Sequence, residues 1–306
     1  ILYSGIKAKE KETIIEDIKL GNTDLIIGTH ALIQNQINFS NLALVIIDEQ
    51  HKFGVHQRMT LTTKGKKHDT FPHQLILTAT PIPRTLAMSL YGNLEYSAIN
   101  EMPKGRQDID TIAISEDRRS EVLEKISSKC KDGSQVYWVC PLINESEVLE
   151  CKAATNTYKE LQSKLKNINI GLIHGRMKMA EKEEVMSNFR NKKIDVLVST
   201  TIIEVGLDVP NATVIIIENS ERMGLSQLHQ LRGRVGRGNK KSSCILIFKS
   251  GLSELARKRI DILRKCSNGF DIAKEDLDLR GPGEILGKKQ KGCLLYTSPS
   301  PRDRSL

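Results

Sequence analysis

The sequence predicts an α/β protein of two domains, each built on a parallel sheet with flanking helices. Short runs of β-branched residues alternate with amphipathic stretches of helical period, which is typical of parallel α/β layers. With 306 residues, the chain is long enough for two hydrophobic cores. The alternating pattern restarts after the sequence Pro-Lys-Gly-Arg at 103–106, so we place the linker near residues 102–110.

The first predicted domain covers residues 1–105. A helix is expected over Lys7–Leu20, where isoleucines fall on one face among charged residues. Strands are expected at 25–27, 42–47 and 75–77, and the wholly apolar run 42–47 suits burial on both faces of a sheet. The pattern starts too late for a whole domain, so we expect this domain to be truncated.

The second predicted domain covers residues 106–250 and has a complete α/β pattern. In its third helix we interpret Val185, Met186 and Phe189 as core residues. Six strands are expected, at 111–114, 135–139, 170–174, 195–199, 213–217 and 244–248. Helices are expected at 117–129, 152–166 and 178–190.

The last part of the chain changes character twice. Residues 251–292 contain two predicted helices, 252–266 and 271–279, followed by a glycine-punctuated segment. Residues 293–306 are rich in Ser, Pro and Arg and fit no element, so we expect them to be a non-native tail. The chain does not open with Met, and we expect it to be an internal piece of a longer protein.

Composition excludes several classes of protein. The 39% hydrophobic and 27% charged residues are typical of a globular chain. The longest apolar run is 42–47, whereas a membrane-spanning helix needs about 18 residues, so we expect no membrane segment. The 6 cysteines show no Cys-x-x-Cys spacing, which favours reduced thiols in the cytoplasm over a zinc module or a disulfide scaffold.

The positive charge is concentrated in one stretch. The chain has 46 Lys and Arg against 37 Asp and Glu, a net charge of +9. Residues 222–265 alone hold 12 Lys and Arg and only 2 Asp and Glu. This stretch is either a solvated basic face or a surface for the phosphates of a nucleic acid or nucleotide.

Two neighbouring acids, Asp48 and Glu49, directly follow the most apolar predicted strand. The carboxyl end of a buried parallel strand faces the crevice in which α/β proteins bind ligands. There, one acid can hold Mg²⁺ while the other orients an attacking water. The alternative interpretation is an acidic helix start after a strand.

Two further segments suit phosphate chemistry. Arg234 and Arg237 lie three residues apart on a glycine-rich turn, and a guanidinium is a planar, bidentate phosphate ligand. Thr200 and Asp208 follow a strand and can bond a phosphate and a ribose hydroxyl. The alternatives are a basic loop for a nucleic-acid backbone in the first case and a turn with a helix cap in the second.

Taken together and in this order, these segments resemble the motifs of the superfamily 2 helicases. The finer resemblance is to the bacterial fork-remodelling helicases, carried by residues 48–58, 78–85 and 135–143. Residues 276–290 resemble the translocation element that these helicases share with the transcription-repair coupling factor. The general motifs match Gly28–Leu32, Asp48–His51, Thr78–Pro81, His174–Arg176, Thr200–Pro210 and Gln230–Arg237.

The resemblance implies tandem RecA-like domains of the P-loop NTPase type and a set of residue roles. Asp48 would help hold Mg²⁺, and Glu49 would position the hydrolytic water of ATP. The remaining nucleotide-binding residues would be Gly206 and Asp208 beside the sugar and Arg234 and Arg237 at the γ-phosphate.

Other matched positions imply coupling, DNA contact and translocation. Nucleotide state would be coupled to the other domain through Gln50, His51, Thr78, Thr80 and Gln230. The DNA backbone would be gripped by Thr29, His30, His174, Arg176 and Thr200. Arg280 and Gln290 would act in translocation.

The resemblance also implies an activity for the parent protein. It would use ATP to drive duplex DNA through a motor that remodels stalled forks and Holliday junctions in recombination and repair, as a cytoplasmic monomer. The phosphate-binding sequence Gly-x-x-x-x-Gly-Lys-Ser/Thr is absent, because the Gly-Lys pairs at 65–66 and 287–288 are each followed by Lys. We therefore expect this chain alone to hydrolyse little or no ATP.

Three alternatives remain open at this point. The chain could act as a non-hydrolysing nucleic-acid-binding fragment, or it could be the motor of the transcription-repair coupling factor. It could also be an RNA helicase, because contacts to the backbone alone do not decide the sugar. Residues 51–53 and 137–141 favour the fork-remodelling helicases over the coupling factor.

Overall fold

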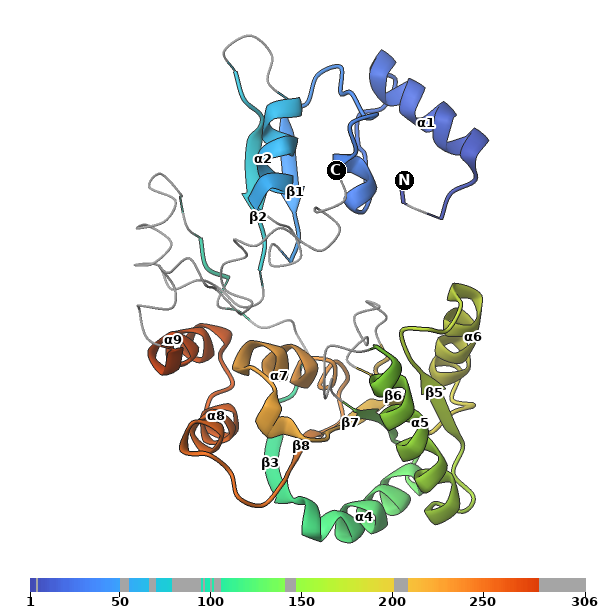
Figure 1. The fold of residues 1–306 in the computed structure, drawn as a ribbon, viewed down its shortest axis with the longest axis vertical. Coiled ribbons are helices and arrows are strands. Elements are labelled where there is room, and N and C mark those ends of the chain that lie inside the picture. Colours follow the sequence, from blue (N-terminus) through green and yellow to red (C-terminus); the bar gives the residue numbers. More distant parts are fainter. Residues whose placement is uncertain are drawn as a thin grey trace. The chain divides into compact units, whose positions relative to one another are not determined.

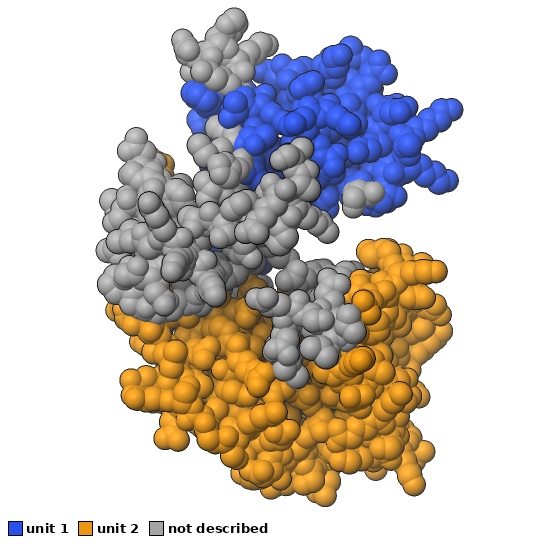
Figure 2. Space-filling view, viewed as in Figure 1, with its two compact units in different colours: residues 1–79, 281–306 blue, residues 80–280 orange. Residues whose placement is uncertain are grey.

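The computed structural model describes residues 1–3, 5–49, 55–65, 70–78, 95, 97–99, 101, 106–140, 147–200 and 209–280. The chain divides into two compact units (Figure 2). Unit 1 comprises residues 1–79 and 281–306, and unit 2 comprises residues 80–280.

Unit 1 contains a small parallel sheet and short helices (Figure 1). Strands β1 and β2 pair in parallel, with Ile47 opposite Ile76. Helix α1 ends at Gly21, whose φ of 82° allows its amide to bond the carbonyl of Ile18. The elements are α1 (Ala8–Leu20), η1 (His30–Ile33), β1 (Leu44–Ile47), α2 (Val55–Lys64) and β2 (His73–Ile76).

The prediction of a strand at 25–27 was wrong. The only pairing at this place among the described residues is an isolated parallel bridge between Leu2 and Gly28. The Leu2 amide donates to Ile27 O, and the Thr29 amide donates to Leu2 O. One bridge forms no ladder, and Leu25 stays 75% exposed, so the apolar run here does not become a sheet strand.

The prediction that both faces of the 42–47 strand are buried was also wrong. Val45 and Ile47 are buried and pack near Leu61 of α2, whereas Leu44 and Ile46 are 50% and 56% exposed. Successive side chains of a strand point to opposite faces, and in the described part of unit 1 only one face of β1 is covered. In this unit, the continuous apolar run 42–47 therefore did not indicate a strand that is buried on both faces.

Unit 2 is built on one six-stranded sheet in which every pairing is parallel, in the order β3-β8-β7-β4-β6-β5. All six strands were predicted, each within two residues of its observed bounds. The strands are β3 (Ile109–Ser115), β4 (Gln135–Val139), β5 (Ile170–Ile173), β6 (Val196–Ser199), β7 (Ala212–Ile217) and β8 (Ser242–Phe248). The expected α/β class with parallel sheets and flanking helices is confirmed.

Helices connect these strands, and Figure 1 shows α4 and α7 on opposite sides of the sheet. The five helices expected in this unit are present, and α7 was not predicted as a helix. The helical segments are η3 (Glu116–Arg118), α4 (Arg119–Lys131), α5 (Glu147–Lys164), α6 (Met179–Arg190), η4 (Ser220–Arg222), α7 (Leu225–Arg232), α8 (Glu254–Lys265) and α9 (Gly269–Arg280).

Each face of the unit 2 sheet has its own core. Trp138 and its neighbours on one face pack under α4 and α5. Tyr137 on the other face packs with residues of α6 to α9, and its ring lies 5.0 Å from that of Phe189. The prediction that Val185, Met186 and Phe189 are core residues is confirmed for Met186 and Phe189, which are buried, whereas Val185 is only partly buried and packs against the same core. This two-sided burial is what a central parallel sheet requires.

The described residues offer neither a membrane helix nor a metal cluster. None of the described helices combines the length and apolarity needed to cross a bilayer. No group of three or more potential metal ligands occurs among the described residues. The five described cysteines are free thiols, and burial raises the pKa of Cys130 and of Cys244 to about 12.

Candidate functional site

The two acids of unit 1 lie at the carboxyl edge of its small sheet. Asp48 directly follows β1, and Thr78 follows β2 by two residues. The Leu77 amide donates to Ile47 O over 2.8 Å, so the strands end side by side. This edge therefore brings Asp48, Glu49 and Thr78 into one neighbourhood.

Glu49 has an uncommon backbone conformation. Its φ is 51°, in the left-handed region that residues other than Gly rarely adopt, and its amide donates to Asp48 Oδ1 over 2.8 Å. Such conformations cost about 1–3 kcal/mol and cluster at functional sites. The turn leaves the Asp48 carboxylate exposed, where it can meet a hard cation.

Thr29 and His30 of unit 1 are exposed at the start of η1. A Cβ at the preceding Gly28 would overlap the carbonyl oxygen of Leu2, so only glycine permits this close backbone approach. The segment is thus fixed by backbone contacts, and the side chains that follow it lie at the surface.

In unit 2, the residues that directly follow four of the strands form a single row at the carboxyl edge of the sheet. The amide of Glu218 donates to Val139 O, that of Cys140 to Ser199 O, and that of Thr200 to Ile173 O, over 3.0, 2.8 and 3.3 Å. His174 follows β5 at the end of the same row. We call Glu218, Cys140, Thr200 and His174 the edge row.

The members of the edge row matched to DNA contact differ in exposure. Thr200 is 1% exposed, and its hydroxyl has no hydrogen-bond partner among the described residues. His174 is half-buried, with Nδ1 3.5 Å from Cys151 Sγ. Burial, Lys182 and Arg176 lower the pKa of His174. Arg176 is exposed in the following turn.

Arg232, at the end of α7, is a structural residue. It is buried and donates through Nη1 to Leu263 O and Cys266 O, over 2.7 and 2.8 Å. Its Nη2 contacts Ser267 O and the Nδ1 of His229, over 3.2 and 2.9 Å. A cation that bonds the last carbonyls of a helix also stabilises the negative end of the helix dipole. Arg232 therefore locks α7 to the end of α8.

The turn after α7 presents the two arginines that the sequence singled out. Gly236 has a φ of 77°, and a Cβ there would meet the Ile109 side chain at 2.8 Å, so the tight turn requires glycine. The turn leaves Arg234 half-buried and Arg237 exposed, with Arg237 Nε donating to Gly233 O over 3.2 Å. Gln230 is half-buried within α7.

Arg106 joins this turn, although the sequence placed it only in a linker. Its Nη2 would lie 3.7 Å from a Cβ on Gly233. Burial and then the charge of Arg237 lower the pKa of Arg106. Burial, Arg232 and Arg106 lower the pKa of His229 to about 4. These cations repel one another, and an anion at the turn would relieve that repulsion. A single linker arginine carries no sequence signal for this placement.

The basic stretch 222–265 divides between two uses. Arg232 is internal, and Arg259 donates to Met223 O and Glu221 O over 2.8 and 3.1 Å. Most of the other cations are exposed, and two of them, Lys258 and Arg264, form ion pairs with Glu254 and Asp261. The exposed set is Arg222, Arg237, Lys240, Lys241, Lys249, Arg257, Lys258, Arg264 and Lys265.

Several predicted site residues lie outside the described residues. Arg280 is the last residue of α9. Six predicted site residues are not among the described residues: Gln50, His51, Thr80, Gly206, Asp208 and Gln290.

Comparison with known proteins defines the class. A DEAD/DEAH box helicase model matches residues 1–89, and a helicase conserved C-terminal domain model matches residues 117–239. The DUF1998 helicase MrfA has the same fold, with a TM-score of 0.61 at 16% identity over 87% of this chain and 40% of that one. The chain therefore has the RecA-like α/β fold of helicase domains.

Closer relatives narrow the assignment. The RecG helicase of Pasteurella multocida is 55% identical across 100% of this chain, and that of Escherichia coli K12 is 53% identical across 94%. The chain spans 44% and 41% of the length of these two relatives. A structure of RecG bound to a three-way DNA junction matches 93% of this chain and 36% of that one, at 44% identity and a TM-score of 0.69. Along its whole length the chain is thus similar to the RecG helicases.

Replacing Arg232 should destabilise unit 2. In Arg232→Met, the carbonyls at the end of α8 lose their donor, and we expect a loss of about 3 kcal/mol in the free energy of unfolding. Arg257→Met, on the exposed face of α8, should cost less than about 0.5 kcal/mol. Both changes in unfolding free energy can be measured by urea unfolding, followed by the fluorescence of Trp138, the single tryptophan of the chain. Equal effects of the two substitutions would contradict the locking role.

His229 should make unit 2 acid-sensitive. Its folded pKa of about 4 lies below the ordinary 6.5, so the unfolded chain takes up the proton first as the pH falls. The stability contributed by the neutral ring is present above pH 6.5 and is lost as the pH falls toward 4, by up to about 3 kcal/mol. The difference in unfolding free energy between the wild type and His229→Gln should shrink over this window. A constant difference from pH 7.5 to 5 would refute it, with the exposed His73→Gln as control.

Proposed function

We propose that this chain is the motor portion of an ATP-dependent DNA helicase or translocase that remodels branched DNA. Its substrates would be stalled forks and Holliday junctions in recombination and repair. The observation that supports this most is the 55% identity to a RecG helicase along the whole chain. The RecG structure on a three-way junction supports DNA as the partner.

The proposed nucleotide chemistry uses residues of both units. ATP is the proposed substrate of the motor, and Mg²⁺ is its proposed metal, with Asp48 as a ligand. Glu49 would position the hydrolytic water. The cations around Arg237 fit a polyphosphate, because guanidiniums bind phosphate oxygens in bidentate fashion. Arg234 and Arg237 would stabilise charge on the γ-phosphate, and Gly206 and Asp208 would lie beside the sugar.

The proposed DNA contacts are to the backbone. Thr29 and His30 would make them from unit 1, and His174, Arg176 and Thr200 from the edge of unit 2. Backbone contacts position a strand but carry no sequence information, which suits an enzyme that moves along DNA. Coupling to nucleotide state would run through Gln50, His51, Thr78, Thr80 and Gln230, and translocation through Arg280 and Gln290.

The same proposal includes the domain boundaries, the cellular location and the oligomeric state of the protein. The domains would divide at 1–105, 106–250 and 251–292, with 293–306 as a non-native tail. The parent protein would act in the cytoplasm as a monomer. The competing function is a nucleic-acid-binding fragment without hydrolysis, which the missing phosphate-binding sequence favours for this chain in isolation.

The test is a chimera in which this chain replaces the matching region of the Pasteurella multocida RecG helicase. We expect the chimera to hydrolyse ATP in the presence of branched DNA, and the isolated chain to show little or no turnover. Glu49→Gln and Arg237→Ala should each lower the DNA-stimulated rate by about a hundredfold or more, since an arginine at the γ-phosphate contributes about 10³–10⁵.

Matched controls carry the same substitutions elsewhere. Glu124→Gln on α4 and Arg190→Ala at the end of α6 are exposed and should leave the rate within about twofold. Normal turnover of the chimera with either site substitution would overturn the proposed roles. DNA-stimulated turnover by the isolated chain would overturn the expectation that it is inactive alone.

A further inference from the structure

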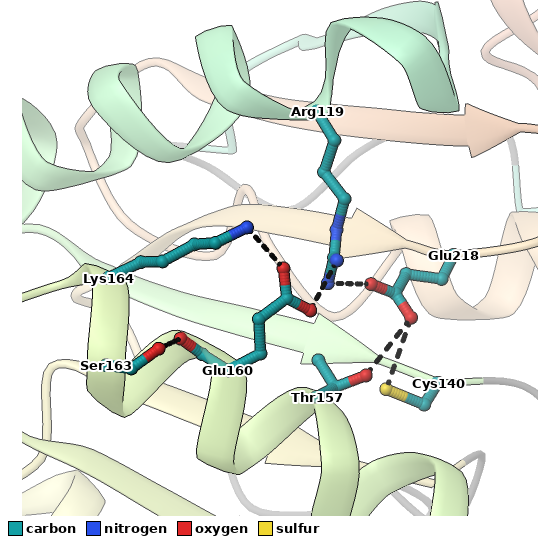
Figure 3. A network of polar contacts seen from close by, with 7 residues as sticks. All are labelled: Arg119, Cys140, Thr157, Glu160, Ser163, Lys164 and Glu218. Atoms are coloured by element: carbon teal, nitrogen blue, oxygen red, sulfur yellow. Dashed lines mark hydrogen bonds and ion pairs between the residues drawn. The ribbon is translucent and has the colours of Figure 1, made fainter.

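Arg119, the first residue of α4, joins two carboxylates from distant parts of unit 2 (Figure 3). Its Nη1 lies 2.5 Å from Glu160 Oε2 on α5, and its Nη2 lies 2.6 Å from Glu218 Oε1 after β7. The guanidinium carbon also lies 5.3 Å from the centroid of the Trp138 ring. Each arm of the fork thus holds a different acid.

The network is largely withdrawn from water. The side chains of Arg119 and Glu218 are 20% and 15% exposed. Burial opposes the charge of Arg119, but Glu218 and Glu160 together raise its pKa. Ion pairs of this kind add little net stability, because desolvation offsets the attraction, while loss of one partner leaves a costly unpaired charge. The role of these ion pairs is therefore to fix the positions of the charges rather than to stabilise the fold.

Glu218 belongs to the edge row that also contains Thr200 and His174. Neighbouring strands lie about 4.8 Å apart, which puts Glu218 about 10 Å from Thr200 across β4. If a phosphate backbone runs along this row, a bare carboxylate at Glu218 repels it. Arg119 supplies the charge that cancels this repulsion.

Helix α5 connects the same network to the other end of the row. Thr157 Oγ1 donates to Glu218 Oε2 over 3.4 Å, and Lys164 Nζ lies 2.8 Å from Glu160 Oε1. Toward the start of α5, Cys151 Sγ lies 3.5 Å from His174 Nδ1. The Arg119–Glu160 pair therefore holds the helix that contacts His174.

We infer that Arg119 is a positioning residue for nucleic-acid binding, which neutralises Glu218 in the edge row and anchors α5 against His174. The inference rests on the proposed DNA contacts of this edge. It assigns Arg119 no direct contact with DNA: its effect passes through Glu218 and Glu160.

The test measures binding of a fluorescein-labelled three-way DNA junction to the full chain at low salt, by fluorescence anisotropy. Arg119→Gln should weaken binding about threefold to tenfold, the effect of one uncompensated charge about 10 Å from one or two phosphates. Arg118→Gln removes the same charge one residue earlier, in an exposed pair with Glu121, and should change binding less than about twofold.

Glu218→Gln separates charge placement from folding. The double variant Arg119→Gln/Glu218→Gln restores the net charge of the row and should return to within about twofold of wild-type affinity. Glu218→Gln alone should bind the junction about twofold to threefold more tightly. Thermal unfolding of each variant shows whether it is folded.

The outcomes distinguish the inference from the proposed function. If Arg119→Gln binds like Arg118→Gln, or the double variant binds no better than Arg119→Gln, Arg119 is only structural. If Arg119→Gln does not fold, unchanged affinity of Glu218→Gln overturns the inference by itself. If His174→Ala weakens binding while these variants do not, the DNA-contact edge stands and the inference fails. If the wild-type chain shows no salt-sensitive binding, the proposed DNA contacts fail with it.

Discussion

The parallel register of the strands is the constraint on which the rest of the structure depends. When all strands of a sheet run the same way, every residue that follows a strand arrives at the same edge. In unit 2 this brings Glu218, Cys140, Thr200 and His174 from four strands into one row, joined by successive backbone bonds. In unit 1 it brings Asp48 and Thr78 together. The sheet topology alone therefore makes neighbours of residues that are far apart in the chain.

Two arginines, the buried Arg232 and the half-buried Arg119, fix helices to this scaffold. Arg232 bonds the carbonyls that α8 leaves unpaired at its end, so the turn carrying Arg234 and Arg237 is held against α8. Arg119 bonds acids on α5 and after β7. In both cases a guanidinium is suited because its rigid fork reaches two acceptors at once, which a lysine ammonium does not match. The two bonded sets lie on different faces of the sheet.

The sequence predicted most of the fold of unit 2 because its central strands are rich in apolar residues and alternate with amphipathic helices, as a sheet covered on both faces requires. The same signal failed in unit 1, where Leu44 and Ile46 stay exposed and the run 25–27 forms no strand. The candidate residues came from motifs. Arg106, Arg119 and Arg232 were missed because each looks locally like any surface arginine. Only the packed structure shows that their partners come from distant segments.

Charge placement explains why acids can lie beside a proposed phosphate path at all. An unpaired carboxylate in the edge row would oppose phosphate binding, yet Glu218 also accepts a bond from Thr157 and so helps seat α5 on the sheet. Because Glu218 is paired with Arg119, it can hold α5 through Thr157 without repelling a phosphate backbone. The arginine turn has the opposite arrangement. Arg106 and Arg237 repel one another, and that repulsion favours an incoming anion. The arginine turn packs against Ile109 and Pro210, at the amino ends of β3 and β7, whereas the edge row lies at the carboxyl ends of the strands. This separation keeps the proposed DNA contacts of the edge row apart from the proposed nucleotide contacts of the turn.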